Sequence, residues 1–446
     1  MGPTRNANST GRLRAVFARQ VRESNMARQT SWALVAELVR MVTQLAMFLI
    51  VTHLFTAGDY GVYVGTIGLL AFVFPFATVG ASYVLLRRVA GEGMEPGRAL
   101  GHATTTVILG GLVTAPLLVL LRPWILPQAS IAVLATSAAT ELIFAGVQDL
   151  AVFVAQATHQ LHVSVPLRLA AGISRLVAVL ILWGTVASPT LAQLTLANLL
   201  AAAFATGASI NLLRRQGISF GRLPRPRTLD LRQGLPFSVG FGADKLRESA
   251  DSVLLLRLDR PVDAGIYGAA SRLVDMAVVP LRSLSHASNA RFFEAGRESV
   301  RVGRRTAVRV TSVALAYAIP TAAVMALLGP TVINLLPGSY QSAAQAVRVL
   351  ALWPIAVSIE MFAGTALTAV GHHRTRVVTN LLSAALNVAL NLLWIPDHGW
   401  RGSVAATLTT SFLSSLVMWA SLVVYGRREP RPQPHQRADA SPIARR

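Results

Sequence analysis

The chain consists mainly of long apolar stretches separated by short polar segments. A helix needs about 20 predominantly apolar residues to cross the hydrocarbon core of a bilayer. We predict twelve such spans, at approximately 30–53, 61–85, 101–121, 131–157, 163–184, 190–212, 234–256, 265–288, 306–328, 343–369, 375–396 and 402–424. No stretch has the alternating pattern of a membrane β-strand, so helices must satisfy the backbone in lipid. The pattern therefore predicts an all-α polytopic membrane protein.

The second six spans repeat features of the first six. Gly61-Val62-Tyr63 opens the second span and Gly265-Ile266-Tyr267 opens the eighth, and Pro75 and Pro280 follow the two tyrosines by twelve and thirteen residues. Many secondary transporters are built from such a duplicated unit, with the substrate path between the halves. We therefore predict two six-helix lobes around a central cavity. The predicted parts are a basic N-terminal segment (1–29), an N-terminal lobe (30–213), a cytoplasmic linker (214–232), a C-terminal lobe (233–424) and a disordered basic tail (425–446).

Composition and charge support a membrane protein with a defined topology. The 446 residues are 53% hydrophobic, which is too apolar for a soluble globular protein. The net charge of +21 comes from arginines that gather in alternate loops and at both ends of the chain. This asymmetry follows the positive-inside rule, so we expect both termini in the cytoplasm and no role in nucleic-acid binding. The dominance of arginine over the single lysine, Lys245, indicates a GC-rich genome, and we expect a bacterial cytoplasmic membrane.

Several enzyme classes have no sequence signal here. The chain has no cysteine, no Gly-rich phosphate loop with Lys and Ser or Thr, and no His-Glu spacing typical of a zinc site. Its predicted outer loops are too short to hold a catalytic domain. We therefore predict a protein that is not an enzyme and uses no cofactor or metal.

Charged residues inside the predicted spans share helix faces. Asp244, Arg247, Glu248 and Asp251 lie at i, i+3, i+4 and i+7, within about 100° of one helix, with Lys245 at the edge of that face. A charge in the bilayer costs a few kcal/mol on insertion scales, so such residues usually face a cavity or a partner. We predict a wet, partly cationic cavity. Its candidate substrate-binding residues are Arg40, Lys245, Arg247, Arg272 and Arg282. Its polar or coupling candidates are Glu37, Gln44, Glu141, Asp149, Asp244, Glu248, Asp251, Asp275, Glu360, Asn387 and Asn391.

A structural alternative applies to each single pair of charges. Glu37 with Arg40, and Arg272 with Asp275, are spaced to neutralise each other and to hold helices together. Arginine in a cavity instead suits a phosphate-bearing headgroup, because its planar fork binds two oxygens at once.

The C-terminal spans carry a family resemblance. Asn391-Leu-Leu-Trp-Ile-Pro396, followed by Gly399-Trp-Arg-Gly402-Ser-Val-Ala-Ala-Thr407, resembles the Asn…Ile-Pro…Gly-x-x-Gly-Ala-Ala-x-Thr pattern of polysaccharide flippases. With the repeat, the chain resembles the Wzx-type branch of the multidrug/oligosaccharidyl-lipid/polysaccharide (MOP) exporter superfamily over roughly residues 30–424.

The resemblance implies a flippase that works by alternating access. Its substrate would be a polyprenyl-pyrophosphate-linked oligosaccharide, moved across the membrane for cell-surface polysaccharide synthesis, including lipopolysaccharide. Cavity arginines would hold the pyrophosphate, and partners would be membrane lipids and the polysaccharide polymerase or export machinery. Related lipid II flippases often have two further helices, which this sequence lacks.

Three other functions remain open. A cation-coupled, MATE-like drug antiporter would need a cation-binding carboxylate, for which Glu141, Asp149 and Glu360 are candidates. A membrane polysaccharide polymerase or glycosyltransferase is opposed by the short outer loops. A scaffold that transports nothing would leave the charges inside the spans unexplained.

Overall fold

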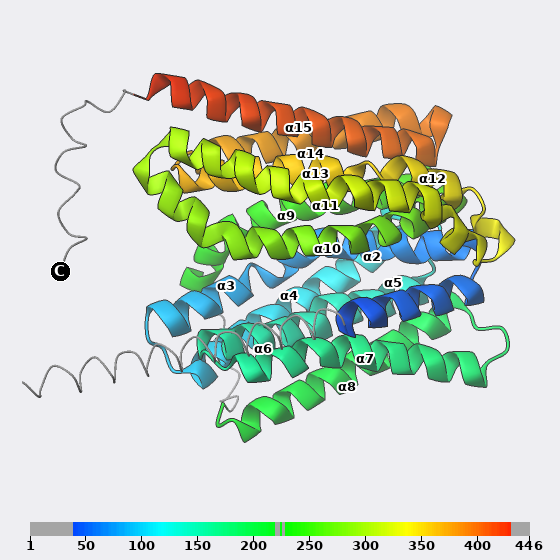
Figure 1. Cartoon of the computed structure of the whole chain (residues 1–446). Helices are drawn as coiled ribbons and strands as arrows, with labels where there is room; N and C mark the ends of the chain where they lie inside the picture. The colour runs from blue at the N-terminus through cyan, green and yellow to red at the C-terminus, as the bar shows by residue number, and fades with distance from the viewer. Residues whose placement is uncertain (1–38, 219–223, 225–227, 430–446) are drawn as a thin grey trace, which may run out of the picture. The chain divides into compact units, whose positions relative to one another are not determined.

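The computed structural model describes residues 39–218, 224 and 228–429. The predicted N-terminal segment 1–29, Glu37, much of the linker and most of the basic tail lie outside the described residues. Within these described ranges the chain is helical and contains no strand (Figure 1). The all-α prediction is therefore confirmed for this part of the chain.

The first of two compact units contains the described residues up to Phe55 together with Leu69–Gly242. Its core is formed by buried leucines of several helices, among them Leu100, Leu150 and Leu167. The elements from the start of the described chain are a helix at Val39–Leu54, α2 (Ala57–Thr78), α3 (Ala81–Leu86), a π-helical turn η1 (Arg87–Gly91), α4 (Pro96–Ile125), α5 (Ile131–Ala138), a π-helical turn η2 (Ala139–Phe144), α6 (Ala145–Ala157), α7 (Leu161–Thr185), α8 (Leu191–Arg215) and α9 (Thr228–Arg257).

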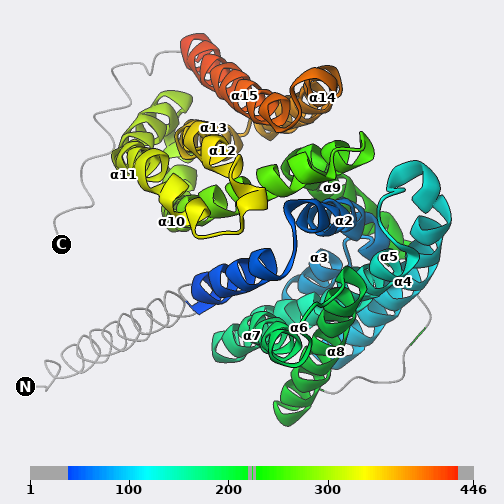
Figure 2. The ribbon, with the colours of Figure 1, turned by 90° about the vertical axis from the view of Figure 1, so that its right-hand side faces the viewer.

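The second compact unit contains Thr56–Gly68 and the described residues from Ala243 onward. Phe292, Phe362 and Leu422 are central to its core, and α13, α14 and α15 lie side by side in Figures 1 and 2. Its further elements are α10 (Pro261–Glu298), α11 (Val300–Asn334), a 3-10 turn η3 (Gly338–Tyr340), α12 (Ala343–Leu350), α13 (Trp353–Ala369), α14 (His373–His398) and α15 (Trp400–Arg428). Both α2 and α9 contribute to the two units, one half to each.

Helix ends follow local sequence signals. Thr190 and Gln193 form a reciprocal capping box at the start of α8, and the Ser299 side chain accepts a hydrogen bond from the backbone N–H of Val302 in α11. Pro96 and Pro261 occupy the first turns of α4 and α10. Backbone N–H groups in a first turn have no acceptor within the helix, so a proline there costs no helical hydrogen bond.

The described residues contain eight helices long and apolar enough to cross a membrane, or nine if the bent pair Gly338–Leu350 and Trp353–Ala369 forms one span. This is fewer than the twelve predicted spans. The start of the first lies outside the described residues, which leaves only Val39–Leu54 of it. The helices α9 and α10 are long enough, but the charges predicted for the cavity lower their hydropathy. The six-plus-six layout, the lobe boundaries and the cytoplasmic termini stay predictions.

The two glycines of the repeated Gly-x-Tyr motif lie against each other's helix. A Cβ at Gly61 would overlap the carbonyl oxygen of Pro261, and a Cβ at Gly265 would overlap that of Ala57. Pro261 precedes Gly265 by four residues, and Ala57 precedes Gly61 by four residues. The contact between α2 and α10 is therefore reciprocal. Glycine permits this close approach of two helix backbones.

We expect Gly265→Ala to lower the unfolding temperature of the purified protein. The added methyl group would force α10 away from α2, at a cost of about 1–3 kcal/mol for overpacking. Gly207→Ala in α8 is the matched control, because a Cβ there meets nothing within 4 Å. That control should be neutral or slightly stabilising, since alanine favours helix. Equal unfolding temperatures for the two variants in a thermal melt would contradict the importance of the contact.

Candidate substrate and coupling site

Charged side chains of α9 and α10 form one group in the second unit, here called the charged cluster: Asp244, Lys245, Glu248, Arg272, Asp275 and Arg282. Lys245 Nζ donates to Glu248 Oε2 at 2.6 Å, so these two residues neutralise each other. Asp275 interacts electrostatically with both Arg282 and Arg272, and both arginines are exposed. Two accessible guanidiniums thus share the Asp275 carboxylate, while Asp244 interacts electrostatically with Arg376, outside the cluster; with Asp244 assigned to Arg376, the cluster has one positive charge in surplus.

Two tyrosines of α2 lie beside Arg272. The Arg272 guanidinium donates a hydrogen bond to the buried Tyr60 hydroxyl and also lies near Tyr63. The Tyr60 ring packs edge-on against Tyr340 with ring centroids 6.1 Å apart, and Tyr340 donates through its hydroxyl to the Thr56 carbonyl at 3.2 Å. These contacts fix the first turn of α2 and orient the Arg272 side chain.

Arg247 and Glu360 form a bidentate ion pair between α9 and α13. Both terminal nitrogens of Arg247 donate to the Glu360 carboxylate, and one also reaches Ser411 Oγ at 3.4 Å. The two side chains are only 21% and 9% exposed. Both terminal nitrogens of the Arg247 guanidinium are therefore already bound to the carboxylate of Glu360, a residue of the same unit.

Asp251 is the centre of a buried polar network. It is 2% exposed and accepts hydrogen bonds from the hydroxyls of Tyr267 and Thr407, the latter at 2.7 Å, and from Asn391 Nδ2 at 2.6 Å. Asn387 is also buried beside Asn391, whose Oδ1 has no hydrogen-bond partner within the described ranges. All the donors to Asp251 found in the described chain are neutral. Because no charged donor neutralises the Asp251 carboxylate, the network can also accommodate one proton or cation beside it.

The C-terminal motif of the sequence is explained by this network and by the adjoining helix corner. Asn391 and Thr407, at its two ends, converge on Asp251. Gly399, immediately before α15, has φ +56° and ψ −132°, a region open mainly to glycine, and a Cβ there would overlap the Asp263 carboxylate. Gly402 lies against the backbone of Trp394 in α14.

Sequence reasoning did not select Tyr267, Thr407 or Tyr60 as site residues. The sequence does carry a signal for these two residues, since Tyr267 ends the repeated Gly-x-Tyr motif and Thr407 ends the C-terminal motif. Tyr60 has no such signal in the sequence. Asn380 Nδ2 donates to Asp244 Oδ1 at 3.4 Å, which joins α14 to α9.

The remaining candidates lie in the first unit. Glu141, in the π-helical turn η2, forms an ion pair with Arg175 at 2.8 Å, and Asp149 accepts a hydrogen bond from Ser82 at 2.6 Å. Arg40 and Gln44 lie on the helix Val39–Leu54 and are partly exposed. The assignment of these residues, and of the charged cluster, to one substrate cavity stays a prediction.

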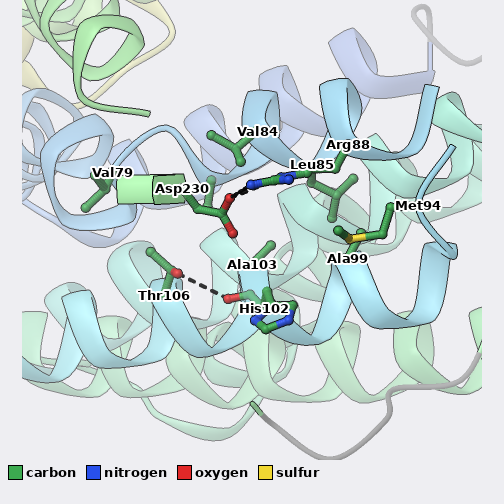
Figure 3. Close-up of a pocket in the computed structure, with 11 residues that line it drawn as sticks. Val79, Val84, Leu85, Arg88, Met94, Ala99, His102, Ala103, Thr106 and Asp230 are labelled. Carbon is green, nitrogen blue, oxygen red and sulfur yellow. Dashed lines mark hydrogen bonds and ion pairs between the residues drawn. The ribbon is translucent and has the colours of Figure 1, made fainter. Parts of the chain in front are cut away.

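A small pocket in the first unit is closed by an ion pair. Arg88 of η1 donates to Asp230 in the first turn of α9, and Figure 3 shows His102 and Thr106 of α4 beside the same space. The Asp230 carboxylate raises the pKa of the Arg88 guanidinium through this hydrogen bond. The pocket has a volume of about 20 Å³, which is room for about one water molecule, so it is not a substrate site.

No group of three or more His, Asp or Glu side chains that could hold a metal ion occurs in the described ranges. The second unit offers two kinds of chemistry: accessible guanidiniums on α10 and a buried carboxylate held by neutral donors on α9.

Sequence comparison gives no relatives, since no family model and no curated protein matches the chain. Solved structures do match. An inward-facing multidrug resistance MATE family transporter of the MOP superfamily has a TM-score of 0.71 at 14% identity, covering 87% of this chain and 95% of that one. The lipid II flippase MurJ, in an inward closed conformation, has a TM-score of 0.70 at 12% identity, covering 87% of each chain.

The chain has the fold of MOP superfamily transporters. A third MOP transporter, from Pyrococcus furiosus, matches with a TM-score of 0.62 at 14% identity over 89% of this chain and 94% of that one. The structural neighbours are transporters and flippases rather than enzymes. Together with the apolar helices, the MOP fold makes this chain a multi-pass membrane protein. The resemblance is confirmed at the level of the MOP fold.

Proposed function

We propose that this protein is a flippase that moves a polyprenyl-pyrophosphate-linked oligosaccharide across the bacterial cytoplasmic membrane by alternating access. The MOP fold supports a transporter, and its neighbours include a flippase of a lipid-linked precursor. The finer assignment rests on the sequence motif of the C-terminal spans and on the charged cluster.

The observation that carries the proposal is the shared carboxylate of the charged cluster. Arg272 and Arg282 face one Asp275, and Lys245 is neutralised by Glu248. An anionic headgroup would balance the second guanidinium beside Asp275, because Asp244 interacts with Arg376 instead. Arginine forks bind phosphate oxygens in pairs, which suits a pyrophosphate better than an organic cation. We propose Arg272 and Arg282 as headgroup contacts; Arg40, in the first unit, and Lys245, which is paired with Glu248, stay candidates from the sequence.

In this mechanism, the protein binds the charged headgroup while the polyprenyl chain stays in lipid. Arg272, oriented by Tyr60, would hold pyrophosphate oxygens, and polar side chains such as Gln44 and Asn380 would bind sugar hydroxyls. Moving the two lobes about the site would then expose the headgroup to the other face of the membrane. The polymerase or export machinery of the polysaccharide pathway would take the delivered substrate.

Mass spectrometry of lipids that copurify in mild detergent tests the proposal directly. We expect a polyprenyl pyrophosphate carrying a saccharide, and we expect Arg272→Ala to lower its amount in the same preparation. Recovery of ordinary phospholipids alone, from cells that make the lipid-linked saccharide, would count against the proposed substrate.

A second candidate, a MATE-like cation-coupled antiporter, is supported by Asp251. The structure pairs Glu141 with Arg175 and Glu360 with Arg247, so these two carboxylates are already neutralised. Asp251 receives only neutral donors among the described residues and lies beside the unpaired Asn391 oxygen. We propose Asp251 as the group that takes up a coupling cation or proton, with either substrate.

We expect Asp251→Asn to abolish coupling while leaving a folded protein. Asparagine keeps the shape of the side chain but not its charge, so an imposed proton or sodium gradient should no longer drive transport in proteoliposomes. The matched control is Asp397→Asn, at an exposed carboxylate near the end of α14. A fluorescent organic cation and a labelled lipid-linked saccharide, assayed in parallel, would separate the two candidate functions. Gradient-driven transport by Asp251→Asn at the normal rate would make Asp251 a structural residue.

A further inference from the structure

A groove of about 500 Å³ lies between the start of α11 and the end of α15 in the second unit. Its lining residues are Arg301, Arg304, Val423, Gly426, Arg427 and Glu429. Figure 1 shows these two helix ends at the same end of the unit. Both helices contain apolar windows long enough to span a membrane, so the groove lies near the membrane–water boundary. The arginine distribution predicts that this face is cytoplasmic.

One arginine of the groove is held by backbone carbonyls. Arg301 Nε donates to the Gly426 carbonyl at 3.0 Å, and its Nη2 donates to the Glu429 carbonyl at 3.0 Å. These bonds tie α11 to α15 and form the floor of the groove. Gly426 lies against this corner, with the Arg301 and Val300 side chains 3.8 Å from where a Cβ would be, which is ordinary van der Waals contact.

The groove already binds an anionic group of the protein itself. The Glu429 carboxylate accepts hydrogen bonds from the backbone N–H groups of Val300, at 2.9 Å, and Arg301, at 3.3 Å. It thus caps the N-terminus of α11, where backbone N–H groups and the helix dipole favour negative charge. Arg304 and Arg427 are different, because among residues 39–218, 224 and 228–429 neither guanidinium has a hydrogen-bond or ion-pair partner.

We propose that this groove binds the phosphodiester headgroup of an anionic glycerophospholipid from the cytoplasmic leaflet. Arg304 and Arg427 would bind the phosphate oxygens, and the apolar Val423 side chain would contact the start of the acyl chains. Basic pockets between membrane helices on the cytoplasmic side are suited to such headgroups. The site is separate from the charged cluster on α9 and α10, so it does not depend on the proposed transport substrate.

The test is lipid binding by the full-length protein in detergent, measured by native mass spectrometry. The probes are phosphatidylglycerol, phosphatidylcholine and inorganic phosphate. We expect retention of phosphatidylglycerol, weak retention of phosphatidylcholine, and no displacement by millimolar phosphate. The double variant R304A/R427A should weaken phosphatidylglycerol binding by about tenfold or more, because each arginine near an anionic lipid surface contributes on the order of 1 kcal/mol.

Three further variants test whether lipid binding depends on the charges of the groove itself. Arg374→Ala removes one exposed guanidinium from the start of α14, outside the groove, and should leave binding unchanged. R304K/R427K should restore part of the binding, since the charge returns without the fork. Glu429→Gln should increase binding several-fold, because it removes the negative charge beside the phosphate.

Three outcomes would overturn the proposal. They are equal loss of binding in Arg374→Ala and R304A/R427A, equal retention of the two phospholipids, and displacement of the lipid by inorganic phosphate. Binding is read directly and not through transport, so a failure here is distinguishable from a failure of the flippase assignment.

Discussion

Replacing Arg272 with alanine should abolish flipping of a labelled polyprenyl-pyrophosphate-linked saccharide in proteoliposomes. Arg272 is accessible, is oriented by Tyr60, and shares Asp275 with Arg282. Each charge-assisted contact to a phosphate contributes about 1.5–3 kcal/mol, so headgroup capture should weaken roughly ten- to a hundredfold. Arg40→Ala should have the same effect if Arg40 holds the same headgroup.

Two further variants separate binding from folding. Arg272→Lys should recover part of the activity, because lysine restores the charge but not the bidentate fork. Arg348→Ala, at an exposed arginine of α12 outside the charged cluster, should flip normally. In cells, the Arg272→Ala protein should be inserted at normal levels while lipid-linked saccharide accumulates inside. Normal flipping by both Arg40→Ala and Arg272→Ala would make these arginines structural.

Hydrophobic patterning predicted the positions of the apolar helices better than it predicted the charged helices and the helix breaks. Apolar length located α4, α7 and α8 to within a few residues, because a hydrocarbon layer selects for length and apolarity alone. Spans were also predicted at 234–256 and 265–288, within α9 and α10, but these two helices are not among those apolar enough to cross a membrane, since their charged residues lower the hydropathy. The break between α2 and α3 was not predicted, because it rests on the positive φ angles of Val79 and Gly80, which no periodicity encodes.

Helical spacing predicted which charges share a face, but not which partner each one finds. The residues at i, i+3, i+4 and i+7 share one face of the continuous helix α9, and a cavity along that face stays a prediction. Within that face, Arg247 meets Glu360, more than a hundred residues away, and Asp251 meets Tyr267 and Thr407. These partners come from other helices, so they follow from tertiary packing and not from local sequence. The local pair predicted from spacing, Arg272 with Asp275, does interact, but Asp275 also faces Arg282.

Variants of the Arg247–Glu360 pair can show whether this buried ion pair stabilises the fold or takes part in transport. Glu360→Ala should destabilise the protein by about 3–5 kcal/mol, because it leaves the Arg247 guanidinium unpaired in a site that is largely closed to water. The double variant R247M/E360L should recover most of that stability, since apolar residues of similar volume often replace a buried ion pair without loss. Both effects can be measured as free energies of unfolding in a denaturant titration of the detergent-solubilised protein.

Transport by R247M/E360L then shows whether the Arg247–Glu360 pair is structural or binds substrate. If Arg247 only holds α9 to α13, R247M/E360L should be stable and should flip substrate normally. If Arg247 exchanges Glu360 for a substrate phosphate during transport, the double variant should be equally stable but inactive, because the guanidinium fork is gone. Because Glu360 already fills that fork with two hydrogen bonds, we expect normal flipping. A stable double variant that cannot flip the labelled saccharide would return Arg247 to the substrate-binding residues, together with Arg272 and Arg282.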